Sequence, residues 1–311
     1  MAGVGSTVAG VELSPGLHDQ SLAGVDQFLF GVDQSLLGVE PSAAAAGAAV
    51  AASQARRRCS RLSPMPRWLT ARVLAEAGVP HAFSTAEAGD MKDPAARAAW
   101  LAAVAPGLPL ATAKQVHGAR AVWGDAAAAP EADALLARRG LAVGVFTADC
   151  VPILLADPAA GLAAAVHAGW RGTIAETAVT AVRALVEAGA RVAELRAALG
   201  PHIRPCCYEV SEELAARFAA RFGRAVVTRT PTPHLDLGAA NRALLAELGL
   251  AAAHVETLAA CTACARAPAF FSYRREKELS DRMLRPPASA SARRPAEPAS
   301  SGRQLSIIAP A

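Results

Sequence analysis

Residues 141–166 read LAVGVFTADCVPILLADPAAGLAAAV, a stretch with three short apolar runs separated by turn signals. The runs, residues 141–146, 151–155 and 162–166, have the length of strands and are too short for typical helices, so we expect buried strands. Asp149 and Cys150 stand between the first two runs and are predicted on a tight loop at the strand ends. His167 follows the third run.

Helical spacing of apolar residues follows this stretch. It predicts three helices, at residues 173–188, 211–222 and 237–248. Thr173 and Ser211 are expected to cap the first two helices, and Gly189 and Gly249 to end the first and the third. Strands that lie close together in the sequence, with helices at irregular intervals, favour an α+β fold over a strictly alternating parallel one.

The composition is that of a globular protein with a large core, because 53% of the 311 residues are hydrophobic. The formal charge is +4, but residues 1–55 carry five acids and no Lys or Arg, which leaves +9 on the remainder (+4 plus 5). This mild basicity suits an anionic substrate, and without an aromatic-interleaved basic patch we expect no nucleic-acid partner. The six cysteines do not form the dense framework of a small secreted domain and the start is not signal-like, so we expect a cytoplasmic protein. No apolar run is long enough to span a bilayer, so we expect no membrane partner.

Residues 1–63 are predicted to be a low-complexity, disordered extension that precedes a domain at residues 64–311. Acids recur every seven residues from Glu12 to Glu40, but Gly24, Gly31 and Gly38 recur in the same repeat. Each glycine costs about 1 kcal/mol in a helix, which argues against a coiled coil.

His117, Cys150 and His167 combine two imidazoles with one thiolate, the donors that a borderline-soft divalent ion such as zinc prefers. Three protein ligands would leave a fourth position for water or substrate, as in a catalytic zinc site. The separations of 33 and 17 residues are no local metal signature, however. On residue type alone, Cys150 could equally be a small buried side chain and the histidines turn residues.

Several words occur in a fixed order between Arg67 and Ala309. They are KQVHG at 114–118, TADCVP at 147–152, HAGWRGT at 167–173, LGPHI at 199–203 with CYEV at 207–210, and FFSYRR at 270–275. In this order they resemble the YfiH-type laccase-domain family, named historically as polyphenol oxidases and understood as zinc-dependent purine nucleoside phosphorylases. The resemblance implies a single-domain, layered α/β/β/α sandwich with mixed sheets.

The resemblance also implies one Zn²⁺ per chain on the three ligands, with phosphate as co-substrate. The nucleoside would be adenosine, inosine, guanosine or methylthioadenosine. Because zinc lowers the pKa of a bound water to about 7, the same site could also act as an adenosine deaminase. The sequence ranks none of these nucleosides and leaves the oligomeric state open.

Further site residues are predicted around the ligands. Arg171 stands in a glycine-flanked loop that feeds the helix expected from Thr173, so free amides and a forked cation favour an anion, interpreted as phosphate. The candidate catalytic residues are Asp149, Arg171 and Gln115. The candidate substrate-binding residues are Arg171, Lys114 and Arg274. A turn cap at Asp149, a purely structural turn at Arg171 and a surface ion pair at Arg274 remain alternatives.

The chain departs from the family pattern in three places. At Ala86 the family continues into Thr-Arg and paired glycines, so a lost arginine could weaken substrate binding here. Residues 277–301, rich in Pro, Ser and Arg, separate the SYRR word from Gly302 and Arg303 and are predicted to be a disordered insert. Arg204 stands where the family usually has a glycine.

Residues 261–264, CTAC, have no partner pair of cysteines nearby and are interpreted as buried or incidental thiols.

Three other functions would use these residues differently. Cys150 could be a nucleophile activated by His167 in a hydrolase, although no oxyanion hole is identified. The chain could instead be a zinc-bearing interaction module without catalysis. A copper laccase needs several His-x-His pairs for its trinuclear cluster, and none of the seven histidines here forms such a pair.

Overall fold

The structure is a computed structural model that describes residues 65–229, 231–265, 269–283 and 302–311. All of them belong to one compact unit, Ser63–Ala311. The extension predicted at residues 1–63 lies outside the described residues, as does the 284–301 part of the predicted insert.

The described chain contains short strands with helices at irregular intervals. The helices are α2 (Arg72–Ala75), α3 (Pro94–Val104), α4 (Trp170–Ile174), α5 (Thr177–Glu187), α6 (Glu212–Phe222), α7 (Leu237–Glu247) and α8 (Tyr273–Met283), with 3-10 turns η1 (Ala86–Ala88), η2 (Val192–Glu194), η3 (Arg224–Val226) and η4 (Ala252–His254). The strands are β1 (Trp68–Leu69), β2 (His81–Ser84), β3 (Leu110–Ala111), β4 (Ala121–Trp123), β5 (Ala134–Arg138), β6 (Ala142–Thr147), β7 (Val151–Asp157), β8 (Leu162–Ala168), β9 (Arg196–Leu199), β10 (Val227–Arg229), β11 (Pro233–Leu235), β12 (Val255–Thr257) and β13 (Gln304–Ile308). Within this part of the chain, no helix has the length and apolar character to cross a bilayer.

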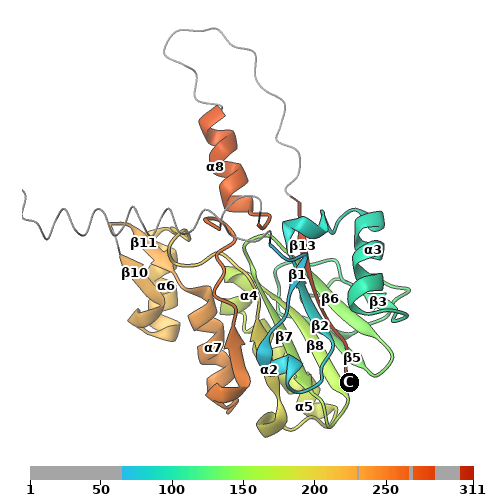
Figure 1. Cartoon of the computed structure of the whole chain (residues 1–311). Helices are drawn as coiled ribbons and strands as arrows, with labels where there is room; N and C mark the ends of the chain where they lie inside the picture. Colours follow the sequence, from blue (N-terminus) through green and yellow to red (C-terminus); the bar gives the residue numbers. More distant parts are fainter. Residues whose placement is uncertain (1–64, 230, 266–268, 284–301) are drawn as a thin grey trace, which may run out of the picture. The chain divides into compact units, whose positions relative to one another are not determined.

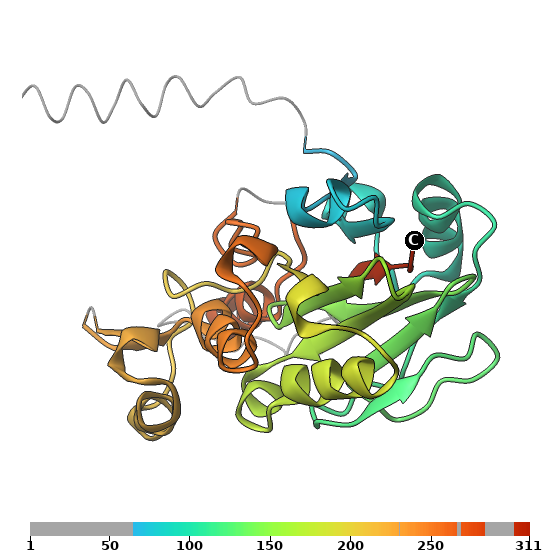
Figure 2. The same ribbon diagram turned by 90° about the horizontal axis from the view of Figure 1, so that it is seen from below.

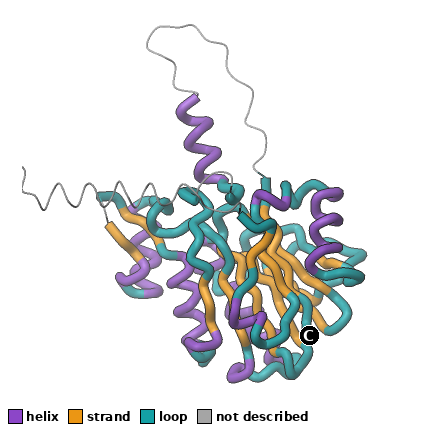
Figure 3. Tube along the Cα trace, in the orientation of Figure 1, coloured by secondary structure: helices purple, strands orange, loops and turns teal. Residues whose placement is uncertain are grey.

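Two mixed sheets form the centre of the molecule (Figures 1 and 3). One has six strands in the order β12-β9-β7-β8-β5-β4, and the other has five in the order β1-β2-β13-β6-β3. In the six-stranded sheet β7 pairs antiparallel with β8 and β9, whereas β4 pairs parallel with β5. β10 and β11 form a separate two-stranded ribbon.

The apolar core lies between the two sheets and on both of their outer faces. Along β7, Leu154 packs with Phe83 of the other sheet, while Ile153 and Leu155 pack on the opposite side with α5, α6 and α7. Side chains of a strand alternate between faces, so a strand buried on both faces is apolar throughout. Figure 2 shows α5 covering the outer face of the six-stranded sheet.

The outer face of the five-stranded sheet is covered by α3, whose fully buried Trp100 packs with Leu305 and Ile307 of β13. The layers are therefore helix, sheet, sheet and helix, and the predicted α+β sandwich with mixed sheets is confirmed.

The three predicted strands are confirmed as β6, β7 and β8, and Ser211 caps α6 by accepting a hydrogen bond from the Leu214 amide. The single helix predicted at residues 173–188 is wrong, because Glu176 adopts φ 60° and divides it into α4 and α5. α4 begins at Trp170 with Gly169 as its N-cap, so Thr173 is not a capping residue.

The start of the predicted insert also differs from expectation. Residues 277–283 continue α8, whose amphipathic sequence begins at Tyr273, so this part is helical and not disordered. Beyond the undescribed residues, β13 pairs antiparallel with both β2 and β6 in the middle of the five-stranded sheet.

Candidate metal centre

The three predicted metal ligands come together where several strands end. Cys150 lies in the short turn between β6 and β7, and His167, on β8, faces Pro152 of β7 in the strand register. His117 lies in the loop between β3 and β4 with a left-handed φ of 61°. Their ligand atoms all lie within 4.8 Å of one another. The two imidazole rings meet edge to face, with centroids 4.8 Å apart.

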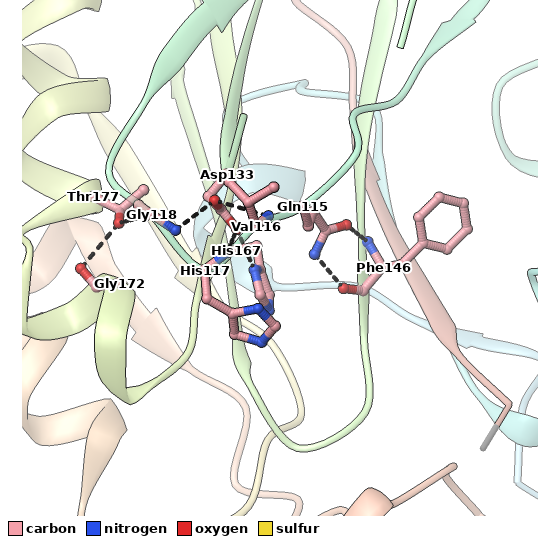
Figure 4. Close-up of polar contacts among 9 residues, drawn as sticks. All are labelled: Gln115, Val116, His117, Gly118, Asp133, Phe146, His167, Gly172 and Thr177. Atoms are coloured by element: carbon pink, nitrogen blue, oxygen red, sulfur yellow. Dashed lines mark hydrogen bonds and ion pairs between the residues drawn. The ribbon is translucent and has the colours of Figure 1, made fainter. Parts of the chain in front are cut away.

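Asp133 holds two of these ligands in place (Figure 4). Its fully buried carboxylate accepts from His167 Nδ1 at 2.8 Å and from the amides of Val116, His117 and Gly118 at 3.2, 3.0 and 2.7 Å. With the proton on Nδ1, the Nε2 atom of His167 is left as the lone-pair donor to a cation. The same carboxylate therefore orients His167 and shapes the loop that carries His117.

Gly169 permits the close packing around the ligands. A Cβ atom at this position would lie 2.8 Å from Cys150 Sγ and 3.3 Å from His117 Cδ2. Its φ of −73° is open to any residue, so the requirement is for space and not for backbone conformation. The sequence GW at the end of β8 thus brings the chain directly against the thiol.

Cys150 and His167 perturb one another's protonation. Burial opposes ionisation of the Cys150 thiol, but His167 and His117 outweigh it and lower its pKa from 9.0 to about 6. Burial likewise disfavours imidazolium, but Cys150 and Asp133 raise the pKa of His167 from 6.5 to about 9. Near neutral pH the pair is therefore a thiolate beside an imidazolium, a charge distribution that a divalent cation can replace.

The donor set fits zinc. Tetrahedral Zn–N and Zn–S bonds of about 2.0 to 2.3 Å place donors about 3.3 to 3.8 Å apart, so small side-chain shifts would close the observed triad on one ion. Three protein donors leave one coordination position for another ligand. The buried Asp133 behind His167 is the kind of carboxylate that fixes a metal-binding imidazole.

The three ligands line a cavity of about 700 Å³. Its basic lining residues are Lys92, Arg171, Arg274, Lys277 and Arg303, and Asp149 is the one carboxylate among its described lining residues. Phe146, Trp170, Ile203 and Tyr208 add apolar and aromatic walls. The cavity is therefore suited to an anionic ligand with a flat apolar part.

The predicted anion-binding Arg171 does line the cavity, but in a different setting. It is the second residue of the five-residue α4 and does not precede a helix beginning at Thr173. Its guanidinium stacks on the Trp170 ring with the central carbon 4.2 Å from the ring centroid. The cation is thus held by its aromatic neighbour at the cavity wall.

Arg274 also lines the cavity, with its guanidinium donating to the carbonyls of Cys207 and Glu209 at 3.2 and 2.8 Å. Its backbone amide donates to Asp149 Oδ2 at 2.7 Å, and Thr262 Oγ1 donates to Asp149 Oδ1 at 2.5 Å. The Asp149 carboxylate therefore joins the first turn of α8 to the loop that carries Thr262, beside the cavity. The backbone of Asp149 has a left-handed φ of 86°.

Two other predicted residues lie differently. The Gln115 side chain exchanges two hydrogen bonds with the backbone of Phe146, at 2.7 and 2.8 Å, and so anchors the loop that carries His117 to β6 (Figure 4). Lys114 is absent from the described lining of the cavity, because its exposed side chain pairs with Glu131 at 2.7 Å. Successive residues of this extended segment point to opposite sides, which separates Lys114 from the site.

Sequence reasoning missed four residues of the site. Asp133 precedes an apolar run, and only its distant partners reveal its role. Tyr208 stands in a quoted word without an assigned role. Lys92 comes from the segment just after the altered Ala86 loop, and Arg303 reaches the cavity despite the long separation from Arg275. Both supply positive charge to the cavity.

Comparisons with known proteins point to one group. The sequence profile of the family described as "Multi-copper polyphenol oxidoreductase laccase" matches residues 81–285. A purine nucleoside phosphorylase of Deinococcus radiodurans is 43% identical over 54% of this chain and 66% of its own length. One of Streptomyces coelicolor is 46% identical over 52% of this chain and 68% of its own length. An adenosine deaminase from an unknown prokaryotic organism is 44% identical over 46% of this chain and 56% of its own length.

The alignments thus span about two thirds, or less, of these curated relatives. Among solved structures, YlmD of Geobacillus stearothermophilus is 26% identical with a TM-score of 0.64, and the match covers 80% of this chain and 98% of that one. The Bacillus licheniformis hypothetical protein YfiH has the same coverage and TM-score at 23% identity, and so shows the shared fold.

Proposed function

The chain belongs to the family described as multi-copper polyphenol oxidoreductase laccase, and we propose that within this family it is a zinc-dependent purine nucleoside phosphorylase. One observation carries the proposal: a two-histidine, one-cysteine donor set opens onto a cationic cavity of about 700 Å³. The names of the Deinococcus and Streptomyces relatives support the choice of reaction.

His117, Cys150 and His167 would hold the zinc ion. When bound, zinc would supply Lewis-acid stabilisation of negative charge at its open position. Asp133 keeps the proton on Nδ1 of His167 and fixes the position of His117 through the loop amides. The neighbouring Gly169 leaves room for these groups to converge.

The remaining residues of the cavity would bind the two substrates. Phosphorolysis places phosphate below the anomeric carbon of the nucleoside while negative charge builds on the departing purine. Arg171, Arg303 and Lys92 supply the positive charge for phosphate, and Arg171 is preorganised by stacking on Trp170. Tyr208 and neighbouring apolar side chains offer a wall for the flat purine.

Asp149 and Arg274 would act mainly by shaping the cavity. The Asp149 carboxylate already accepts two hydrogen bonds, which leaves further lone pairs for a substrate hydroxyl. Gln115 would position the His117 loop through its two bonds to Phe146. Lys114 takes no part in this proposal, because it lies outside the described lining.

Adenosine deaminase activity is a second candidate, favoured by the similarity to the named adenosine deaminase. That reaction replaces the amino group of the purine with the oxygen of water and needs no phosphate. The two activities can therefore be separated by omitting phosphate, although they would use the same metal ligands.

The alternatives make different demands on the donor set. Among the described residues, only one of the groups of side chains that could hold a metal ion contains histidine. This group has two histidines, which are too few for the trinuclear copper cluster of a laccase. A Cys150 hydrolase is compatible with the lowered thiol pKa but would need no zinc. An interaction module would bind zinc without turnover.

The test is metal analysis of the purified full chain together with a nucleoside screen, run with and without phosphate. We expect zinc at the triad, phosphate-dependent release of free purine, and loss of both in Cys150→Ala. A triad without zinc would refute the proposal and favour the hydrolase. Zinc without turnover of any purine nucleoside would refute it in favour of the module.

A further inference from the structure

A second cluster of metal-binding side chains lies outside the site just described. Residues 261–264, CTAC, have no partner pair in the sequence nearby, but the fold supplies one in Cys206 and Cys207. The four sulfur atoms all lie within 4.8 Å of one another, and Cys206 Sγ and Cys264 Sγ are 3.5 Å apart. The interpretation of the CTAC cysteines as incidental thiols therefore overlooked partners more than fifty residues away.

We propose that Cys206, Cys207, Cys261 and Cys264 bind a structural zinc ion. A tetrahedral site with Zn–S bonds of about 2.3 Å has sulfur atoms about 3.8 Å apart, close to the spacing observed here. Four thiolates complete the coordination shell, so the ion would have no open position and no catalytic role. The set is one of sulfur alone, which selects zinc over harder cations.

The backbone around the cluster is arranged to receive thiolate charge. Burial opposes ionisation of Cys261, but the backbone amides of Arg204, Cys264 and Ala263 outweigh it and lower the pKa of its thiol. Burial, followed by the neighbouring cysteines, raises the pKa of Cys206 to about 11, because a second thiolate would repel the first. A divalent ion would remove this conflict among like charges.

The surrounding charges also suit the site. Four thiolates and one Zn²⁺ carry a net charge of about −2. Arg274 and Arg275 line the adjacent cavity of about 340 Å³, together with Cys206, Cys207 and Cys264. The two guanidiniums partly offset the charge of the cluster and the nearby Glu209 and Glu278.

The position of the cluster explains what the ion would do. Cys207 precedes Tyr208, which lines the large cavity, and Cys261 precedes Thr262, which donates to Asp149. Cys261 also forms a parallel bridge with His202, next to Ile203 of the same cavity. The ion would therefore join two loops that form one wall of the substrate cavity, while leaving the His117, Cys150 and His167 ligands separate.

The test measures zinc by mass spectrometry in the full chain, purified under reducing conditions. The variants are Cys150→Ala, the double variant Cys261→Ser with Cys264→Ser, and Cys59→Ser as a control that changes none of the seven proposed ligands. We expect about two zinc ions per chain in the wild type and Cys59→Ser, and about one in each of the other two. If zinc binds at the four cysteines but not at His117, Cys150 and His167, the wild type contains one zinc ion and only the double variant loses it.

Cobalt substitution gives a second measurement that leaves the four cysteines intact. In Cys150→Ala loaded with Co²⁺, we expect the strong sulfur-to-metal absorption of a four-thiolate site. A zinc-free Cys150→Ala protein without this absorption would overturn the proposal. So would wild-type zinc content in a folded double variant, iron in place of zinc, or an intact mass showing a native disulfide among the four cysteines.

Discussion

Asp133→Asn should weaken zinc binding and destabilise the fold, because the substitution preserves shape but removes half of the acceptors. Asp133 Oδ1 accepts from the His117 amide and His167 Nδ1, and Oδ2 accepts from the Val116 and Gly118 amides. An asparagine can satisfy one of these pairs with its oxygen, but its NH₂ group would then face the donors of the other pair.

The magnitude follows from those contacts. Two hydrogen bonds to a buried charge, at about 1.5 to 3 kcal/mol each, give a loss of about 3 to 6 kcal/mol in the free energy of unfolding of the metal-free protein. If the asparagine oxygen accepts from the Val116 and Gly118 amides, His167 loses its orienting partner. If the oxygen accepts from His167 instead, the loop that carries His117 loses the hydrogen bonds of Val116 and Gly118 and loosens. In both cases we expect zinc affinity to fall by about 10- to 100-fold.

The assay is competition with a chromophoric chelator for affinity and urea denaturation of metal-free protein for stability. Asp157→Asn is the matched control. Asp157 is 1% exposed and its carboxylate also accepts two backbone amides, from Ala160 at 3.0 Å and Arg191 at 2.9 Å, but it ends β7 far from Cys150. It should lose stability and keep zinc affinity. A folded Asp133→Asn protein with zinc affinity within about threefold of wild type would refute the orienting role.

Three further predictions concern the cavity and its ligands. Arg171→Ala should lower phosphorolysis about a hundredfold, or about 2 to 3 kcal/mol, through a higher KM for phosphate, and should spare deamination. The control is Arg138→Ala, which removes an arginine stacked at the same 4.2 Å from the ring of Trp123. Equal loss of both activities in Arg171→Ala would refute the phosphate assignment. Gly169→Ala should weaken zinc binding about tenfold in a chelator competition, because its Cβ meets Cys150 Sγ at 2.8 Å; unchanged affinity would show that the chain relaxes there. In zinc-free protein, the rate of Cys150 alkylation, measured by peptide mass spectrometry, should rise as pH increases through about 6. In His167→Ala the midpoint of this rise should shift toward pH 9.0. A wild-type midpoint near 9.0 would contradict the thiolate assignment.

The same Cys150 and His167 pair should leave the pH dependence of stability almost flat. The raised pKa of His167 contributes stability that is present below 6.5 and is lost as pH rises through about 9. The lowered pKa of Cys150 contributes stability that is present above 9.0 and is lost as pH falls through about 6. The two contributions have opposite slopes over the same window, so denaturation of zinc-free wild type and Cys150→Ala/His167→Ala should differ little in slope between pH 6.5 and 9.

Local sequence was sufficient for features that depend on neighbouring residues. Continuous apolar runs predicted β6, β7 and β8, because burial on both faces leaves no polar alternation. Ser211 and Gly249 correctly marked a helix start and a helix end, since capping and positive φ are properties of single positions. The residue types of His117, Cys150 and His167 by themselves indicate a metal site.

Contacts between distant segments were decided by the tertiary structure. Asp133 becomes a ligand-orienting group only when β5 pairs with β8 and brings it beside His167. Arg303 reaches the cavity because β13 inserts between β2 and β6, and Cys206 and Cys207 meet the CTAC loop only through the folded chain. Periodicity records which face of an element is buried, but strand order and register arise from packing of the whole sheet, and these determine which side chains converge.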